Sequence, residues 1–166
     1  LTVEEAARLT GRGFISALGV YGFKVGGFIV DGGFPAGREG ERIPPLLFSK
    51  PIPEGWRFVV CIPDAPIPRV MEVKAREEEL LKSLRPMPRE VSAELSRLVL
   101  MKMLPAFLEG DLKTFGEALT AFNRRLGGFW SSYQAGAYCD PVVEEGVNLL
   151  LREGAACACQ SCWGPT

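Results

Sequence analysis

Residues 26–33, Gly-Gly-Phe-Ile-Val-Asp-Gly-Gly, place a short apolar run between two pairs of glycines. Because paired glycines are typical of turns, the sequence predicts a strand over this run. A second strand is predicted over Trp56–Ile62, where β-forming residues follow one another until Pro63. Residues 35–54, between the two, are rich in Pro, Gly and charge. They are predicted to connect two halves of the chain.

Helical signals surround these strands. Thr2 and Glu5 have capping-box spacing for a helix to about Leu9, and Asp140-Pro141 is a well-formed helix start. Further helices are predicted over residues 14–20, 72–84, 89–104 (with residues 98–101 buried on all sides), 112–126 (ended by Gly127 and Gly128) and 141–153. Residues 155–166 are expected to form a strand or an extended loop returning to the sheet. Few strands and several helices, not strictly alternating, predict an α+β architecture.

Composition excludes several functions. The chain has 166 residues, 47% of them apolar, which suits one domain of ordinary size with a real core. Its net charge of -1 argues against a dedicated nucleic-acid binder, and no stretch approaches the roughly 20 apolar residues of a membrane span. The absence of histidine removes His-based triads, general bases and metal ligands. The five cysteines are an odd number and no signal peptide is visible, so we expect a reduced, cytoplasmic environment.

Both ends of the sequence read as cut. The chain starts at Leu1 without a methionine, and it stops just after Gly164-Pro165 with no closing element. We therefore expect an internal fragment of a longer chain.

The first candidate site is the glycine-rich segment from Gly11 to Gly19. Glycines let the backbone approach a ligand, and a helix start offers free N–H groups and a positive dipole. Arg12 adds a planar fork for phosphate and Ser16 adds a hydroxyl. The functional interpretation is a phosphate or pyrophosphate cradle, although the spacing matches neither the dinucleotide nor the Walker pattern. The structural interpretation is a helix entry with Arg12 in solvent.

Two further segments have functional and structural interpretations. Asp31, at the exit of the first strand, is placed to bind Mg²⁺ or a ribose hydroxyl, but Asp-Gly after a strand is also common turn chemistry. Cys157, Cys159 and Cys162 are close enough in sequence for a metal site or a redox C-x-x-C pair. Metal sites usually need four ligands, and only Cys61 or Cys139 is left to complete the set. For these cysteines the structural interpretation, small and mostly buried residues, is favoured.

Two single residues are lesser candidates. Lys102 interrupts an apolar helix end, so it either reaches the surface or faces an anionic pocket. Gln134 follows the aromatic stretch 129–133, which is more typical of a core than of a stacking platform.

Three segments together resemble one family, the β-ribofuranosylaminobenzene 5′-phosphate synthases. The order and spacing agree over nearly the whole chain. The matching segments are Gly11-Arg12-Gly13 with Ser16-Ala17, Gly19 and residues 26–33; residues 100–106 with Glu109-Gly110-Asp111 and Phe115-Gly116; and residues 160–166, Gln-Ser-Cys-Trp-Gly-Pro-Thr, which are similar to the family's Gln-Ser-Ser-Trp-Gly-Pro-Thr loop.

The resemblance implies a fold and a reaction. The fold is that of the GHMP superfamily, with residues 1–54 as part of an α+β N-terminal half and residues 55–166 as a truncated, ferredoxin-like C-terminal half. In the reaction, 4-aminobenzoate or a hydroxylated relative condenses with phosphoribosyl pyrophosphate, and CO₂ and pyrophosphate leave on the way to methanopterin-type cofactors. Mg²⁺ is expected, with no tightly bound organic cofactor. The partners are small-molecule substrates, neither nucleic acid nor membrane, and a homodimer is left open.

The resemblance also singles out site residues. It implies substrate or phosphate binding by Gly11, Arg12, Gly13, Ser16, Ala17, Gly19, Asp31, Gln160, Ser161 and Gly164. The loop at residues 160–166 would close over the glycine-rich segment. The resemblance names no catalytic residue in this sequence and no protein metal ligand set.

The chain departs from the family at its cysteines and at its start. The family usually has glycines at the positions of Cys157 and Cys159, and serine at that of Cys162. If those glycines need positive φ or close ligand contact, cysteine would strain or block the loop. The family's N-terminal portion has no counterpart here, so we expect this chain to be inactive by itself. Two alternatives stay open: an ATP-dependent small-molecule kinase of the GHMP type, and a non-catalytic thiol- or metal-binding protein.

Overall fold

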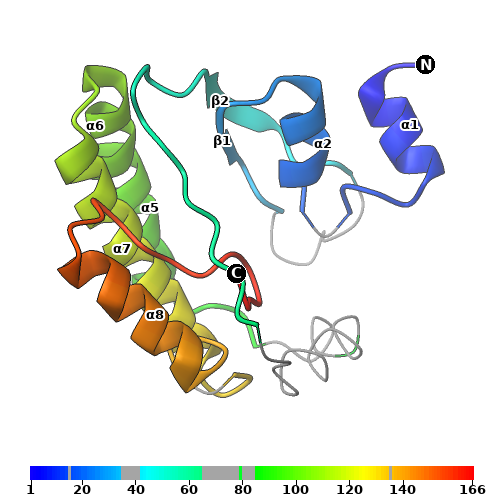
Figure 1. The fold of residues 1–166 in the computed structure, drawn as a ribbon. Coiled ribbons are helices and arrows are strands. Elements are labelled where there is room, and N and C mark those ends of the chain that lie inside the picture. The colour runs from blue at the N-terminus through cyan, green and yellow to red at the C-terminus, as the bar shows by residue number, and fades with distance from the viewer. Residues whose placement is uncertain (15, 35–41, 65–78, 80–84, 135) are drawn as a thin grey trace. The chain divides into compact units, whose positions relative to one another are not determined.

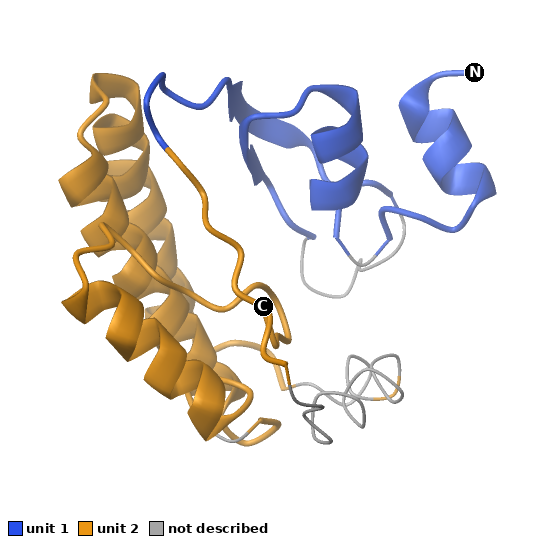
Figure 2. Ribbon diagram, viewed as in Figure 1, with its two compact units in different colours: residues 1–56 blue, residues 57–166 orange. Residues whose placement is uncertain are grey.

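The computed structural model describes residues 1–14, 16–34, 42–64, 79, 85–134 and 136–166. It divides into two compact units, Leu1–Trp56 and Arg57–Thr166 (Figure 2). Each unit has its own elements and its own buried residues, and each is described by itself below.

Two short helices open the first unit (Figure 1). Helix α1, Val3–Leu9, begins at the predicted capping box: the Glu5 N–H donates to Thr2 Oγ1 at 3.1 Å and the Thr2 N–H to Glu5 Oε2 at 2.7 Å. Helix α2 is Leu18–Lys24 rather than the predicted 14–20. Its N-cap is Ala17.

The sheet of the first unit has two antiparallel strands, β1 (Phe28–Asp31) and β2 (Leu46–Lys50). Strand β1 is the predicted one. Strand β2 lies inside residues 35–54, which the sequence assigned to a connector, so that assignment was wrong here. Prolines on both sides of β2 give this region the composition of a loop. They lie outside the paired residues of the strand, where a missing N–H costs no hydrogen bond between strands.

The core of the first unit joins the helices to the sheet. Its buried residues are Ala7, Ala17, Val20, Tyr21 and Ile43. The partly buried side chains of Val3 in α1, Ile29 in β1 and Leu46 in β2 pack against them. The Tyr21 hydroxyl donates to the Pro44 carbonyl at 2.6 Å. This bond ties α2 to the segment that leads into β2.

A helical layer forms the second unit. The predicted helix 89–104 is a longer rod of three parts, α5 (Arg89–Leu98), the π-helical turn η1 (Val99–Met103) and α6 (Leu104–Glu109). Pro105 explains the wider, π-helical turn η1. Its ring would clash with the backbone carbonyl one turn earlier in a regular α-helix, and it has no N–H to donate. Leu100 and Met101 are 56% and 67% exposed, so the expectation that residues 98–101 are buried all round was wrong. Only one side of the rod packs against α7.

Helix α7, Leu112–Trp130, is capped by Asp111 and does not end at Gly127 and Gly128 as predicted. Gly127 lies within the helix and packs against the backbone of Ala137, where any side chain would collide. Helix α8, Pro141–Arg152, follows the predicted Asp140 cap and is succeeded by Gly154 at a φ of +94°. The start and the approximate end predicted for α8 are confirmed.

One predicted strand is absent from the described part of the second unit, and residues 155–166, predicted as a strand or an extended loop, form a loop. Residues 57–62 have no regular structure, although Trp56–Ile62 was predicted to be a strand, because no neighbouring strand pairs with them among the described residues. Residues 155–166 run as a loop beside α7 and return to no sheet within the described part. The predicted helix 72–84 lies, apart from Glu79, outside the described residues. The α+β class is confirmed. Within the described ranges, no helix combines the length and apolar character needed to cross a bilayer.

Candidate functional site

The glycine-rich segment begins where α1 ends. The Gly11 N–H donates to the Arg8 carbonyl at 3.1 Å and the Arg12 N–H to the Ala7 carbonyl at 2.7 Å. These two amides therefore complete the C-terminus of α1 rather than pointing at a ligand. Arg12 itself is exposed, and its side chain is the part of this turn that can meet phosphate.

The rest of the segment leads into α2. Ser16 is exposed, and its Oγ accepts from the Leu18 N–H at 3.3 Å. Ala17 is fully buried in the core and caps α2 without a side-chain hydrogen bond. Gly19 is exposed, with open space around its Cα. Of the predicted cradle residues, Arg12, Ser16 and Gly19 are thus at the surface, and Ala17 serves packing.

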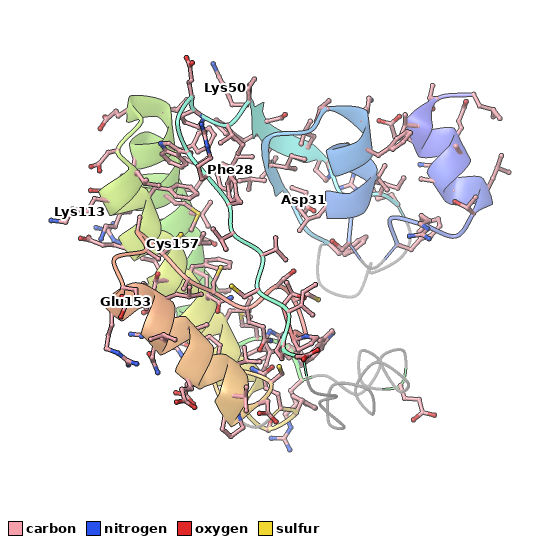
Figure 3. The ribbon with its side chains drawn as sticks, in the orientation of Figure 1. Phe28, Asp31, Lys50, Lys113, Glu153 and Cys157 are labelled. Atoms are coloured by element: carbon pink, nitrogen blue, oxygen red, sulfur yellow. The ribbon has the colours of Figure 1, made fainter. Side chains whose placement is uncertain are left out.

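Asp31 lies at the end of β1 (Figure 3). Its Oδ1 accepts the Gly33 N–H at 2.9 Å, the geometry of an Asx turn. The structural interpretation of Asp31, as part of a turn after the strand, is therefore confirmed. The turn uses one carboxylate oxygen.

The C-terminal loop, residues 160–166, is held by Gln160. This residue is 6% exposed. Its Oε1 accepts the Cys139 N–H at 2.6 Å, and its Nε2 donates to the Cys162 carbonyl at 2.7 Å. Both ends of the amide are used within the protein, so Gln160 organises the loop.

The loop is also closed on itself. The Ser161 N–H donates to the Thr166 carbonyl at 2.6 Å, and the Gly164 N–H donates to the Ser161 carbonyl at 2.8 Å. Trp163 is buried against Trp130 of α7, with ring centroids 5.1 Å apart. A Cβ on Gly164 would stand 2.4 Å from Cys139 Sγ, so the loop needs glycine there. Ser161 is exposed and offers its hydroxyl to solvent.

The cysteines do not form the predicted alternative site. Within the described residues, no three His, Cys, Asp or Glu side chains gather closely enough to hold a metal ion. Burial raises the pKa of the Cys157 thiol, and burial together with Cys157 raises the pKa of Cys159. A redox-active thiol needs its pKa lowered instead. This leaves the thiol- or metal-binding alternative without support.

The two departures at Cys157 and Cys159 do not strain the backbone. Among the described residues other than glycine, Cys162 alone has a positive φ, 51°. Cysteine therefore fits positions 157 and 159 without the left-handed conformation that would demand glycine. At position 162, serine and cysteine face the same backbone cost.

The lesser candidates both have structural partners. Lys102 reaches the surface and pairs with Glu117 of α7 at 3.0 Å. Gln134 is buried, and its Nε2 donates to the carbonyls of Gly136 at 3.1 Å and Gly127 at 3.5 Å. Neither faces a described pocket as a free ligand group.

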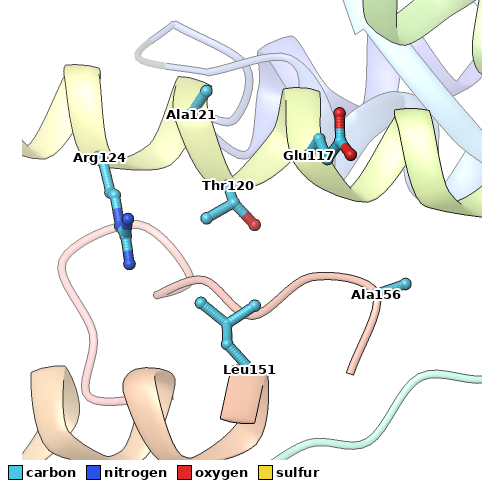
Figure 4. Close-up of a pocket in the computed structure, with 6 residues that line it drawn as sticks. All are labelled: Glu117, Thr120, Ala121, Arg124, Leu151 and Ala156. Carbon is cyan, nitrogen blue, oxygen red and sulfur yellow. The ribbon is translucent and has the colours of Figure 1, made fainter. Parts of the chain in front are cut away.

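A shallow groove of about 310 Å³ lies between α7, the end of α8 and the following loop (Figure 4). Its lining is mainly apolar and consists of Glu117, Thr120, Ala121, Arg124, Leu151 and Ala156. The Thr120 hydroxyl is buried and has no hydrogen-bond partner among the described residues. None of the predicted site residues lines this groove.

Sequence reasoning missed Asn123. Its side chain bonds both backbone groups of Gln160. A signal was present, because Gly116, Thr120, Asn123 and Gly127 are spaced four, three and four residues apart. That spacing puts small and polar residues on one face of α7, the face on which the loop segments pack.

Three curated proteins named β-ribofuranosylphenol 5′-phosphate synthase are similar to this chain. The one from Methanothermobacter thermautotrophicus is 32% identical over 173 aligned positions, which cover 99% of this chain and 50% of that protein. This chain is β-ribofuranosylphenol 5′-phosphate synthase-like. The relative from Archaeoglobus fulgidus is 36% identical over 72% of the chain, and that from Methanocaldococcus jannaschii is 33% identical over 72%. No family model matches the sequence.

The synthase resemblance expected from the sequence is thereby confirmed. The synthase-like chain spans about half the length of the first of these relatives, and the aligned parts cover 39% and 38% of the other two. The predicted cradle and Asp31 belong to the first unit, and Gln160, Ser161 and Gly164 belong to the second. Closure of the loop over the cradle stays a prediction.

Proposed function

We propose that this chain is part of an enzyme that transfers a phosphoribosyl group to an aromatic acid in the synthesis of methanopterin-type cofactors. The observation that carries the proposal is the match of 99% of the chain to a synthase named for a ribofuranosylphenol phosphate. In the reaction, the bond from ribose C1 to pyrophosphate breaks and a ring carbon bonds to C1. The ring carboxylate leaves as CO₂, and its electron pair restores the aromatic ring.

The GHMP fold is part of the same proposal. The small sheet with α1 and α2 is compatible with an N-terminal α+β half, and the helices α5 to α8 with the helical layer of a ferredoxin-like half. The proposed domains, residues 1–54 and 55–166, follow from the family resemblance.

The exposed polar groups are the ones we assign to phosphate. Pyrophosphate leaves with negative charge, so preorganised donors around it lower the barrier. Arg12 carries a guanidinium fork at the surface of the first unit, and Ser16 and Ser161 carry exposed hydroxyls. Gly11 and Gly13 would let the backbone bend around the phosphates, since both adopt positive φ. Gly19 and Gly164 would shape the binding surface rather than donate to it, whereas Ala17 is fully buried and would support the segment by packing.

Asp31 fits the expected Mg²⁺. Proteins commonly hold this ion through one or two carboxylates plus substrate phosphates, with water filling the other positions. Asp31 is half-buried and commits one carboxylate oxygen to its turn, which leaves the other for an ion carried in by pyrophosphate. Bound there, the ion would neutralise charge on the leaving group.

The acceptor ring needs an electron-donating substituent, because the ring carbon attacks as a nucleophile. The relatives are named for a phenol, which points to a hydroxyl at that position, whereas the sequence resemblance included the amine. We therefore propose 4-hydroxybenzoate and 4-aminobenzoate as the two acceptors to compare.

The test is release of labelled CO₂. Intact protein is incubated with Mg²⁺, phosphoribosyl pyrophosphate and each carboxyl-labelled acid, and pyrophosphate is counted in parallel. Equal amounts of CO₂ and pyrophosphate support the proposal and identify the acid. No binding of phosphoribosyl pyrophosphate by folded protein refutes it. An ATP-dependent phosphorylation of a small alcohol would support the kinase alternative instead.

A further inference from the structure

We propose that Asn123, in the middle of α7, is a positioning residue that fixes the C-terminal loop through Gln160. That the loop binds a substrate rests on the proposed function above. Its fixation by Asn123 rests on the hydrogen bonds alone.

The first step is the bond pair between Asn123 and Gln160. Asn123 Nδ2 donates to the Gln160 carbonyl at 3.0 Å, and Asn123 Oδ1 accepts the Gln160 N–H at 3.3 Å. A single planar amide thus satisfies both backbone groups of one loop residue, as a neighbouring strand would. A flipped amide would set oxygen against oxygen, so the pairing fixes the orientation of Asn123.

The second step passes from the Gln160 backbone to its side chain. Because Asn123 holds the Gln160 backbone, the Gln160 amide can reach the Cys139 N–H at 2.6 Å and the Cys162 carbonyl at 2.7 Å. The Cys162 residue has a φ of 51°, a conformation that costs energy without such support. Three chain segments, α7, residues 138–139 and the loop, therefore meet at one buried glutamine.

The third step is the surface that results. Trp163 packs on Trp130, and the Ser161 and Gly164 amides close the loop internally. Ser161 and Cys162 stay exposed on this fixed frame. Gln160, a substrate-binding candidate by resemblance, becomes a positioning residue, and Ser161 is the polar side chain left to touch a ligand.

Asn123→Ala is the test, with Arg124→Ala as the matched control. Arg124 is the next residue on the same helix, is exposed, and makes one long bond of 3.4 Å to Asn148. In Asn123→Ala we expect the Gly164 and Ser161 amides to exchange with solvent at least tenfold faster. We expect Arg124→Ala to exchange like the native protein, and both variants to keep the native helix content.

Kinetics separate positioning from simple loss of structure. If the loop is ordered in only a tenth of the Asn123→Ala molecules, apparent affinity for the ligand falls tenfold, because the ligand must select the ordered state. Saturating ligand restores the order. We therefore expect the KM for phosphoribosyl pyrophosphate to rise about tenfold with kcat changed less than threefold. Lower stability alone would reduce the amount of active enzyme and leave KM unchanged.

The outcomes are distinct. Unchanged exchange in folded Asn123→Ala overturns the proposal, and so does an unchanged KM in an active enzyme. If native protein neither binds phosphoribosyl pyrophosphate nor releases CO₂, the proposed function fails, and the exchange data still decide whether Asn123 fixes the loop. If the variant does not fold, native protein supplies the test: the Gln160, Cys139 and Gly164 amides must share one level of protection. A freely exchanging Gly164 amide refutes the proposal.

Discussion

Replacing Gly127 by alanine tests how tightly α7 packs against the turn before α8. A Cβ at this position would lie 1.9 Å from the Ala137 carbonyl oxygen and 2.8 Å from its carbon. Real Cβ atoms essentially never come within 3.0 Å of such atoms, so the backbone would have to retreat by about 1.1 Å. Backbone cannot rotate away as a flexible side chain can.

The expected magnitude is a balance of two opposing effects. Alanine in place of glycine within a helix gains about 1 kcal/mol from propensity. Forcing an extra carbon into a packed interior costs about 1–3 kcal/mol, and the backbone clash at Gly127 favours the upper end. We therefore expect Gly127→Ala to lower the free energy of unfolding by about 1–2 kcal/mol.

Gly128 provides the control. It is the next residue on the same helix, and a Cβ there meets nothing within 4 Å. Gly128→Ala keeps the propensity gain without the clash, so we expect it to stabilise the protein by about 0.5–1 kcal/mol. The two neighbouring substitutions should thus have opposite signs.

The assay is urea unfolding followed by tryptophan fluorescence. The two units can unfold separately, so the probe has to report on the second unit alone. A Trp56→Phe background leaves Trp130 and Trp163, both in that unit, as the only tryptophans. If Gly127→Ala proves as stable as Gly128→Ala, α7 does not pack against Ala137 and the reasoning is refuted.

Three further predictions concern single side chains. Thr120→Val should stabilise the protein by about 1 kcal/mol in the same unfolding assay, because it removes a buried hydroxyl that lacks a partner; destabilisation would mean that the hydroxyl is bonded. The Asp111 carboxylate caps α7, and its hydrogen bonds to Thr114 lower its pKa. The carboxylate therefore contributes to the free energy of unfolding above about pH 4, and this contribution is lost as the pH falls through the lowered pKa. Acid titration of stability should therefore be shallower in Asp111→Asn, and identical curves would contradict this. Because burial raises the pKa of the half-buried Cys157 thiol, it should react with a maleimide near pH 7 more slowly than exposed Cys162, as peptide mass spectrometry would show; faster labelling of Cys157 would count against its burial.

The helix caps were predictable because their signals are local. Thr2 with Glu5, and Asp140 with Pro141, satisfy backbone groups within one turn of the residues concerned. The same locality made β1 predictable from its flanking glycines. Nothing beyond a few neighbouring residues was needed.

Three of the wrong predictions involve partners outside the segment concerned. Strand β2 is defined by its pairing with β1, whereas its composition suggested a loop. Helix α7 runs through Gly127, and the contact with Ala137 that requires a glycine there is not visible in the local sequence. Residues 57–62 carry every local mark of a strand and have no described strand beside them.

In the candidate site, too, the sequence selected residues, but contacts between distant positions decide what they do. Resemblance selected Gln160 and Gly164, but their contacts show structural roles in the loop. The role of Asn123 could not be predicted from sequence alone, since it depends on hydrogen bonds to Gln160, which lies 37 positions away. For the cysteine cluster the sequence favoured a structural interpretation over a metal or redox site, and within the described residues no metal-binding group is found.

The apolar segment 57–62 has a practical consequence for handling the protein. Phe58, Val59, Val60 and Ile62 are 69–80% exposed, and no charge falls among them. Such uncharged, β-prone stretches are the usual starting points of fibrils. The chain's own safeguards are Arg57 and Pro63 on either side. Concentrated protein, or salts that strengthen apolar association, should drive self-assembly through this segment, so storage at low ionic strength and low concentration should limit it.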